Sequence, residues 1–242
     1  MPPEQKAAKL APSSEGFPTR AELVTKITAF LGEYSLPLLP DYTIVVEGTT
    51  DVAYLHRAAE LALAGGGEDI LAVPVGAWRR SDRILVCTPT KPGGEGRGGT
   101  PLMVRLAHEL RTFVFGPLEL FSGLVFVFDH DDAGLQAQDH IESFGYRRGR
   151  HSISLDPRAH PGACGTKQVT VEDLLPLGLQ KRFFETGGRW CDATYQEGEI
   201  IRFKWHTNSK SDLRDFTCEH GTLAEFGELV SVLRRARRAM SL

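Results

Sequence analysis

The sequence predicts an α/β fold: a mostly parallel, Rossmann-like sheet flanked by helices, with helical additions at both ends. Short apolar runs alternate with stretches of helical periodicity along the chain, which is the element order of a parallel sheet. The run 124–128 is apolar at every position, as expected for a strand buried on both faces. Carboxylates and a glycine follow it directly, at Asp129, Asp131, Asp132 and Gly134. Open α/β sheets place their ligands at this edge.

Composition sets broad limits on the class of protein. The 242 residues are 41% hydrophobic, with a net charge of −3, which fits one large domain or one domain with an appendage. This charge does not indicate a nucleic-acid partner, but local basic patches could still surround an acidic site. The four cysteines form no CxxC pair, which predicts free thiols rather than a zinc site. With no membrane-length apolar stretch or secretory signal, we expect a cytoplasmic protein that does not bind membranes.

The N-terminal segments precede the predicted sheet. Residues 1–18 are rich in Pro, Ala, Ser and Lys and are expected to be disordered. In the segment 19–40, Thr19 can cap a helix. Its apolar face consists of Leu23, Ile27, Phe30 and Leu31. That face could pack on the sheet or bind a partner, and packing is the favoured interpretation.

The central part, residues 41–185, is predicted to be the domain that contains the sheet. Its expected strands are 42–46, 70–75, 84–87, 124–128 and 152–155, and its expected helices are 51–64, 101–115 and 133–144. The glycine-rich stretch 91–100 is expected to be a surface loop. Residues 186–242 are expected to be a C-terminal extension that closes with a basic helix from 223, while the role of 186–222 stays open.

Three groups of acidic residues carry the functional prediction. They are Glu47 with Asp51, then Asp129 and Asp131 with Asp132 as a further candidate, and finally Glu172 with Asp173. The first two groups follow predicted parallel strands, so they should meet at one edge of the sheet. Oxygen ligands suit Mg²⁺ or Mn²⁺, and such an ion can polarise a phosphoryl oxygen. As the alternative, Asp51, Glu172 and Asp173 could simply cap helices.

Two motifs, VVEGTTDVAYL and VFVFDHDDAG, together resemble the Toprim domain, which topoisomerases, primases and several nucleases share. The form EGxxD is closest to the overcoming-lysogenization-defect (OLD) nucleases, here without their ATPase domain. The resemblance covers roughly residues 40–185. It implies a Toprim-like fold that binds one or two Mg²⁺ or Mn²⁺ ions. The implied ligands are Glu47, Asp51, Asp129 and Asp131, then Glu172 and, as the weaker candidate, Asp173. The implied late catalytic lysine is Lys210, with Lys204 behind it.

The resemblance implies a metal-dependent endonuclease that cleaves DNA or RNA. It further implies an anti-phage defence effector that works with a separately encoded ATPase, as an oligomer or hetero-complex. Candidate phosphate-binding residues are Arg79, Arg80, Arg147, Arg148, Lys181 and Arg182, although basic runs of this kind more often form a solvated face. Two alternatives remain: a non-catalytic sensor or docking module that binds metal and nucleic acid, and primase-like nucleotidyl transfer. His130 is expected to point away from its acidic neighbours.

Overall fold

The computed structural model describes residues 19–36, 39–73, 82–90, 98–115, 121, 123–164, 167–187 and 191–241. Three sequence-based predictions concern residues outside these ranges. They are the disorder of residues 1–18, the candidates Arg79 and Arg80, and residues 91–97 of the glycine-rich loop. The helices are α1 (Arg20–Glu33), α2 (Thr49–Ala64), α3 (Thr100–Val114), α4 (Asp132–Glu142), α5 (Leu177–Glu185), α6 (Thr207–His220) and α7 (Gly227–Met240). The strands are β1 (Tyr42–Val45), β2 (Leu85–Cys87), β3 (Gly123–Phe128), β4 (Ser152–Ser154), β5 (Cys191–Gln196) and β6 (Glu199–Trp205). Two short 3₁₀ helices are η1 (Pro157–Ala159) and η2 (Val171–Leu174).

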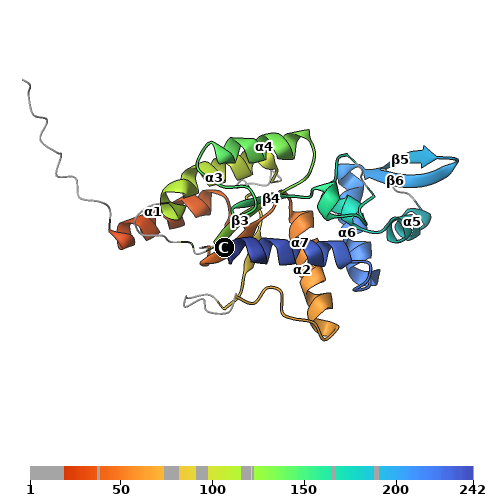
Figure 1. The fold of residues 1–242 in the computed structure, drawn as a ribbon, viewed down its shortest axis with the longest axis horizontal. Coiled ribbons are helices and arrows are strands. Elements are labelled where there is room, and N and C mark those ends of the chain that lie inside the picture. The colour runs from red at the N-terminus through yellow and green to blue at the C-terminus, as the bar shows by residue number, and fades with distance from the viewer. Residues whose placement is uncertain are drawn as a thin grey trace, which may run out of the picture.

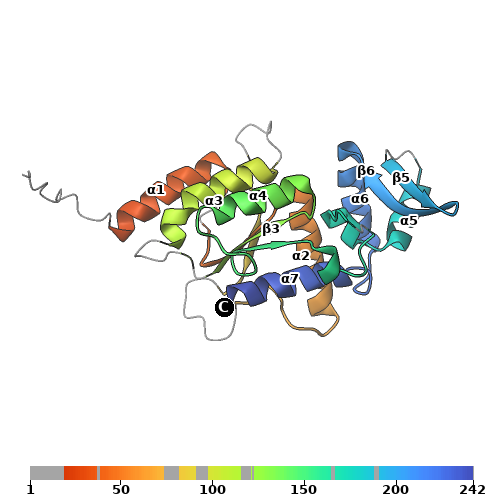
Figure 2. The same cartoon turned by 45° about the horizontal axis from the view of Figure 1, so that its top comes forward.

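A four-stranded parallel sheet in the order β2-β1-β3-β4 forms the centre of the molecule. Helices α1, α3 and α4 cover one face and helices α2 and α7 cover the other (Figures 1 and 2). Successive strand residues alternate between the two faces. Ile44 and Val125 pack toward α2 and α7, whereas Val45 and Phe126 pack toward α1, α3 and α4. The predicted α/β class with a parallel sheet is confirmed.

The predicted strand at 70–75 is wrong for the residues that the structure describes. Ile70 and Leu71 are buried, but they lie in a turn, and Ala72 forms only an isolated antiparallel bridge with Arg83. The apolar run therefore reaches the core without joining a ladder of hydrogen bonds. The sheet strand on this side is β2, which matches the short run expected at 84–87.

Helix α1 packs against its own chain. Thr19 and Glu22 form a capping box at its start, as the Thr19 prediction required. Ile27 and Leu31 are buried in the core shared with α3 and α4. The predicted apolar face is thus part of the hydrophobic core.

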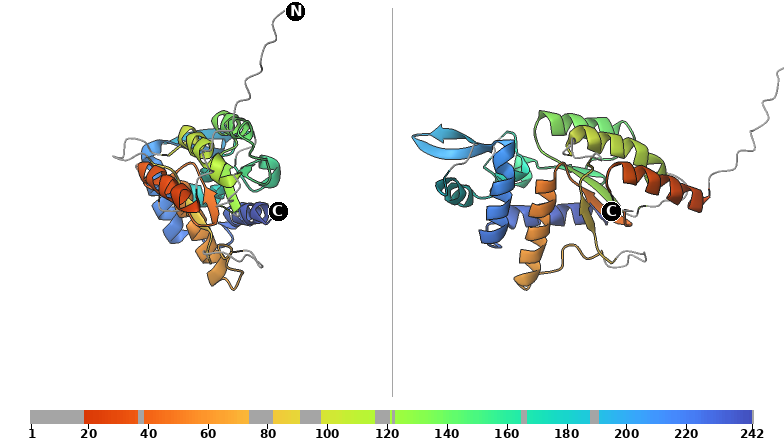
Figure 3. Two further views of the ribbon diagram at one scale, coloured as in Figure 1. Left: turned by 90° about the vertical axis from the view of Figure 1, so that its left-hand side faces the viewer. Right: turned by 180° about the vertical axis from the view of Figure 1, so that it is seen from behind.

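The last part of the chain forms a C-terminal lobe, which consists of α5, β5, β6 and α6, and one more helix, α7, that covers the sheet. The antiparallel hairpin β5–β6 packs with α5 and α6 at one end of the sheet (Figure 3). Glu197 and Gly198 form its two-residue turn with φ of 52° and 84°, a backbone geometry that matches the twist of a hairpin. Helix α7 then returns to the sheet and packs on α2 and β3. No helix within the described ranges is long and apolar enough to cross a membrane.

Candidate active site

Glu47 follows β1 and its backbone is held from two sides. Its carbonyl oxygen accepts hydrogen bonds from the Gly99 amide at 2.6 Å and from the Thr88 hydroxyl at 3.0 Å. Gly98 has φ of +43°, and a Cβ there would lie 2.1 Å from this carbonyl oxygen, so only glycine fits. The Glu47 side chain then reaches across the sheet, where its Oε1 accepts the Asp129 amide at 2.9 Å. These contacts fix one carboxylate at the carboxyl edge of β1 and β3.

Asp51 lies in the first turn of α2, where the predicted helix begins two residues earlier than expected. Its Oδ2 accepts the Gly48 amide at 2.9 Å. The capping interpretation of Asp51 therefore holds. The same carboxylate also interacts electrostatically with Glu47 and Glu172, so the cap belongs to the acidic cluster.

Asp129 and Asp131 follow β3 and have different backbone roles. Asp129 Oδ1 accepts the Val171 amide at 3.1 Å, which connects the end of β3 to η2. Asp131 caps α4, because its Oδ1 accepts the Gly134 amide at 2.7 Å. A Cβ at Gly134 would lie 2.2 Å from the Asp129 carbonyl oxygen, so glycine lets α4 start against the site. Asp132 is exposed in the first turn of α4.

The adjacent acids Glu172 and Asp173 on η2 point to different partners. Both are buried, at 4% and 2% exposure. Glu172 Oε1 lies 2.9 Å from Lys210 Nζ. Asp173 instead caps η2 through Thr170 and forms a two-pronged ion pair with Arg202 on β6, at 2.7 and 2.6 Å. We therefore assign Glu172 to the acidic cluster and Asp173 to anchoring η2.

Two backbone hydrogen bonds hold η2 against the sheet edge. His130 and Val169 exchange amide–carbonyl bonds of 2.7 and 3.1 Å. The His130 side chain lies beside Ser154 of β4, with Nδ1 3.4 Å from the hydroxyl oxygen. Since Ser154 ends the neighbouring strand, His130 faces a side of β3 different from that of the acidic cluster.

Electrostatics show how closely the acids are packed. Burial is the main cause that raises the pKa of Glu47 and of Asp51 to about 7; Asp131 and Glu172 contribute at Glu47, and Glu172 and Glu47 contribute at Asp51. Burial likewise raises the pKa of Asp129 well above its ordinary range, with Asp51, Glu47 and Glu172 adding to the effect. Burial disfavours the charge of Lys210, but Glu172 and the other carboxylates outweigh it, so the pKa of Lys210 is raised. Carboxylates this close repel one another unless a cation compensates them.

The donor set fits a hard divalent cation. Glu47, Asp51, Asp129, Asp131 and Glu172 offer carboxylate oxygens, with neither histidine nor thiolate among them, which suits Mg²⁺ or Mn²⁺. Within the described ranges, no three acidic, histidine or cysteine side chains already surround one common metal position. Lys210 Nζ supplies the positive charge in the present arrangement.

The four candidate phosphate-binding residues that the structure describes do not gather at the site. Arg147 and Arg148 are exposed before β4, toward the amino edge of the sheet, and Arg148 pairs with Asp139 and Glu142. Lys181 and Arg182 lie on α5 of the C-terminal lobe, where Arg182 pairs with Glu225 at 3.1 Å.

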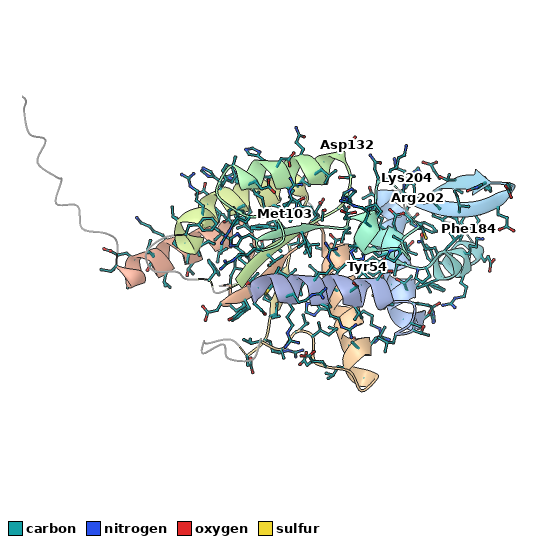
Figure 4. The ribbon with its side chains drawn as sticks, viewed as in Figure 1. Tyr54, Met103, Asp132, Phe184, Arg202 and Lys204 are labelled. Atoms are coloured by element: carbon teal, nitrogen blue, oxygen red, sulfur yellow. The ribbon has the colours of Figure 1, made fainter. Side chains whose placement is uncertain are left out.

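Lys204, the second choice for the catalytic lysine, is exposed on β6 (Figure 4). Lys210, the first choice, is the lysine that meets Glu172.

Searches of protein-family models, of curated proteins and of solved structures find no match to this chain.

Proposed function

We propose that this chain is an Mg²⁺- or Mn²⁺-dependent endonuclease of the Toprim type, most similar to the OLD nucleases. One observation carries the proposal: acids from the end of β1, the start of α2, the end of β3 and η2 meet Lys210 of α6 at the carboxyl edge of a parallel sheet. The motif pair in the sequence supports the same function. A divalent ion bound here supplies Lewis-acid chemistry on a phosphodiester.

Each residue of the cluster has a role in this proposal. Glu47, Asp51, Asp129 and Asp131 would hold the cation, and Glu172 would help to hold it or a second one. Glu47 keeps one carboxylate oxygen on the Asp129 amide, and its other oxygen would be the one available to a cation. Lys210 stabilises negative charge on the phosphoryl group of the substrate.

The substrate and partners follow from the resemblance. The substrate is DNA or RNA, bound through phosphate contacts that do not read sequence. By analogy, a separately encoded ATPase would supply the nucleotide-dependent step in an anti-phage complex. This part of the proposal rests on analogy with the OLD nucleases.

The test is a cleavage assay on plasmid, single-stranded DNA and structured RNA, with Mg²⁺, Mn²⁺ or EDTA, with and without a candidate ATPase. We expect cleavage only with a divalent ion. Glu47→Gln and Asp129→Asn should each lower the rate about 100-fold or more, because every 1.4 kcal/mol of lost transition-state stabilisation is tenfold in rate. Asp132→Asn removes an adjacent exposed carboxylate and should leave the rate unchanged.

The outcomes separate the nuclease from its alternatives. Metal binding without cleavage of any substrate favours the sensor or docking module. Incorporation of nucleoside triphosphates favours nucleotidyl transfer. Cleavage that survives both Glu47→Gln and Asp129→Asn contradicts the site assignment.

A further inference from the structure

Tyr54 lies directly behind the acidic cluster. It follows Asp51 by three residues on α2, and residues at this spacing share a helix face. Its side chain is fully buried, and its ring meets Phe226 edge to face, with 6.5 Å between the ring centroids. Figure 4 shows Tyr54 where α2 lies beside α7. The ring therefore packs in the core.

Packing does not explain the hydroxyl group. The Tyr54 oxygen is buried and makes no hydrogen bond within the part of the chain that the structure describes. The Thr217 hydroxyl lies near enough to lower the pKa of Tyr54 slightly, but it donates its own proton to the carbonyl oxygens of Leu213 and Arg214 at 2.8 and 3.1 Å and forms no hydrogen bond of normal length and angle with Tyr54. A buried hydroxyl without a partner costs about 1–3 kcal/mol, and phenylalanine would fill the same space without that cost.

The charges around this hydroxyl are those of the acidic cluster. Burial raises the pKa of Tyr54 well above its ordinary value, and the Glu172 and Asp51 carboxylates raise it further. The group therefore keeps its proton and stays a hydrogen-bond donor. Hydrogen bonds from a neutral donor to a carboxylate are roughly twice as strong as those between neutral groups.

We propose that Tyr54 is a positioning residue of the acidic site, whose buried hydroxyl donates a hydrogen bond to Glu172 when a divalent cation is bound. This inference rests on the cation site of the proposed function. Without the cation, Glu172 is held by Lys210 at 2.9 Å. A cation that draws on the same carboxylate weakens this ion pair, and Tyr54 then supplies a donor from the rigid helix behind it. Such outer partners typically change metal affinity by about 10–100-fold.

The test is Tyr54→Phe, which removes only the hydroxyl. Calorimetric titration with Mn²⁺ should show a Kd at least about 10-fold higher than that of the wild type. Chemical denaturation of the metal-free protein should show equal or greater stability, because the buried group without a partner is gone. A residue with a packing role alone would leave the Mn²⁺ affinity unchanged.

Two other tyrosines provide matched controls. Tyr34 also has a buried hydroxyl that makes no hydrogen bond to any described residue, but it belongs to the core on the opposite face of the sheet. Tyr34→Phe should therefore keep the wild-type Mn²⁺ affinity. Tyr146 donates to the Ala107 carbonyl at 2.9 Å, so Tyr146→Phe should lower stability and leave the Mn²⁺ affinity unchanged.

Three outcomes would overturn the inference. An unchanged Mn²⁺ affinity in Tyr54→Phe excludes the positioning role while leaving the metal site intact. A loss of metal-free stability shows that the hydroxyl already has a structural partner. Wild-type protein that binds neither Mn²⁺ nor Mg²⁺ removes the proposed cation site, and the inference with it.

Discussion

Lys210 brings a positive charge among closely spaced carboxylates. The metal-free site therefore depends on it, and Lys210→Met should lower the free energy of unfolding. Breaking a fully buried ion pair costs about 3–5 kcal/mol, but the Lys210 side chain is 35% exposed, so we expect about 1–2 kcal/mol after solvent screening. Urea denaturation without divalent ions measures the loss. Lys204→Met removes an exposed lysine and should change stability by less than about 0.5 kcal/mol; an equal loss in both variants would contradict the role of Lys210.

His151 gives a prediction about acid stability. Its Nδ1 accepts the Arg147 amide at 3.0 Å, which requires the neutral ring. Burial, with Arg150 and Arg147, lowers the pKa of His151 from 6.5 to about 4. A lowered folded-state pKa means that the unfolded chain binds the proton more readily. The contribution to stability is therefore complete above pH 6.5 and is lost as pH falls toward 4.

The variant His151→Phe keeps a ring beside Phe115 and Tyr146 but cannot titrate. Its unfolding free energy, measured by urea denaturation across pH 4 to 7, should fall less steeply with acid than that of the wild type. Subtracting one pH profile of the unfolding free energy from the other removes the contribution of the titrating groups that both proteins share. Parallel pH profiles would show that His151 does not carry this effect.

Single residues also show what the sequence could predict about the site. The acids at 47, 51, 129 and 172 were recognisable because each stands directly after a strand or before a helix turn. The separation of Glu172 from Asp173 was not recognisable, since it depends on Arg202, a residue of a hairpin that the sequence did not reveal. The buried hydroxyl of Tyr54 could not be predicted either, because its lack of a partner becomes visible only when the neighbouring helices are in place.

Whole elements were predictable where their hydrophobic pattern matched their environment. Strand β3 is apolar throughout because both of its faces are covered. The hairpin β5–β6 is mostly exposed, so burial imposes little pattern on it, and its turn uses Glu-Gly where Asn-Gly or Asp-Gly would be the stronger signal. Helix α6 buries Ser209, Leu213 and Thr217, a face with one apolar residue in three. These elements carry Arg202 and Lys210, so the part of the site that contains the lysine was the hardest to predict from the sequence.

A testable prediction about a whole element concerns the start of helix α4. Gly134→Ala would place a methyl group 2.2 Å from the Asp129 carbonyl oxygen. Because that atom is backbone, α4 or the end of β3 must shift, and we expect a loss of about 3 kcal/mol or more in unfolding free energy. The control is Gly178→Ala on α5, where a Cβ meets nothing within 4 Å. It should gain about 0.5–1 kcal/mol from helix propensity. Thermal and urea denaturation measure both, and a mild effect at Gly134 would contradict the close approach.

At the scale of the molecule, the sheet and the C-terminal lobe meet at the acidic site. The sheet contributes Glu47 and Asp129, and α6 contributes Lys210, which pairs with Glu172 at 2.9 Å. Helix α7 then returns from the lobe to pack on α2 and β3. A ligand that bridges these parts should therefore stabilise the whole fold rather than one loop.

A divalent cation is that ligand in the proposed function, and its effect on unfolding can be measured without a substrate. A ligand that binds only the folded chain adds about 2.7 kcal/mol at a concentration of 100 times its Kd. Mn²⁺ or Mg²⁺ should therefore raise the Tm in a concentration-dependent way, and EDTA should reverse the rise. Asp129→Asn should abolish the Tm shift because it removes a charge from the centre of the cluster. The control, Asp173→Asn, should keep the Tm shift because Asp173 anchors η2 to Arg202. A Tm shift that persists in Asp129→Asn would place the cation elsewhere on the molecule.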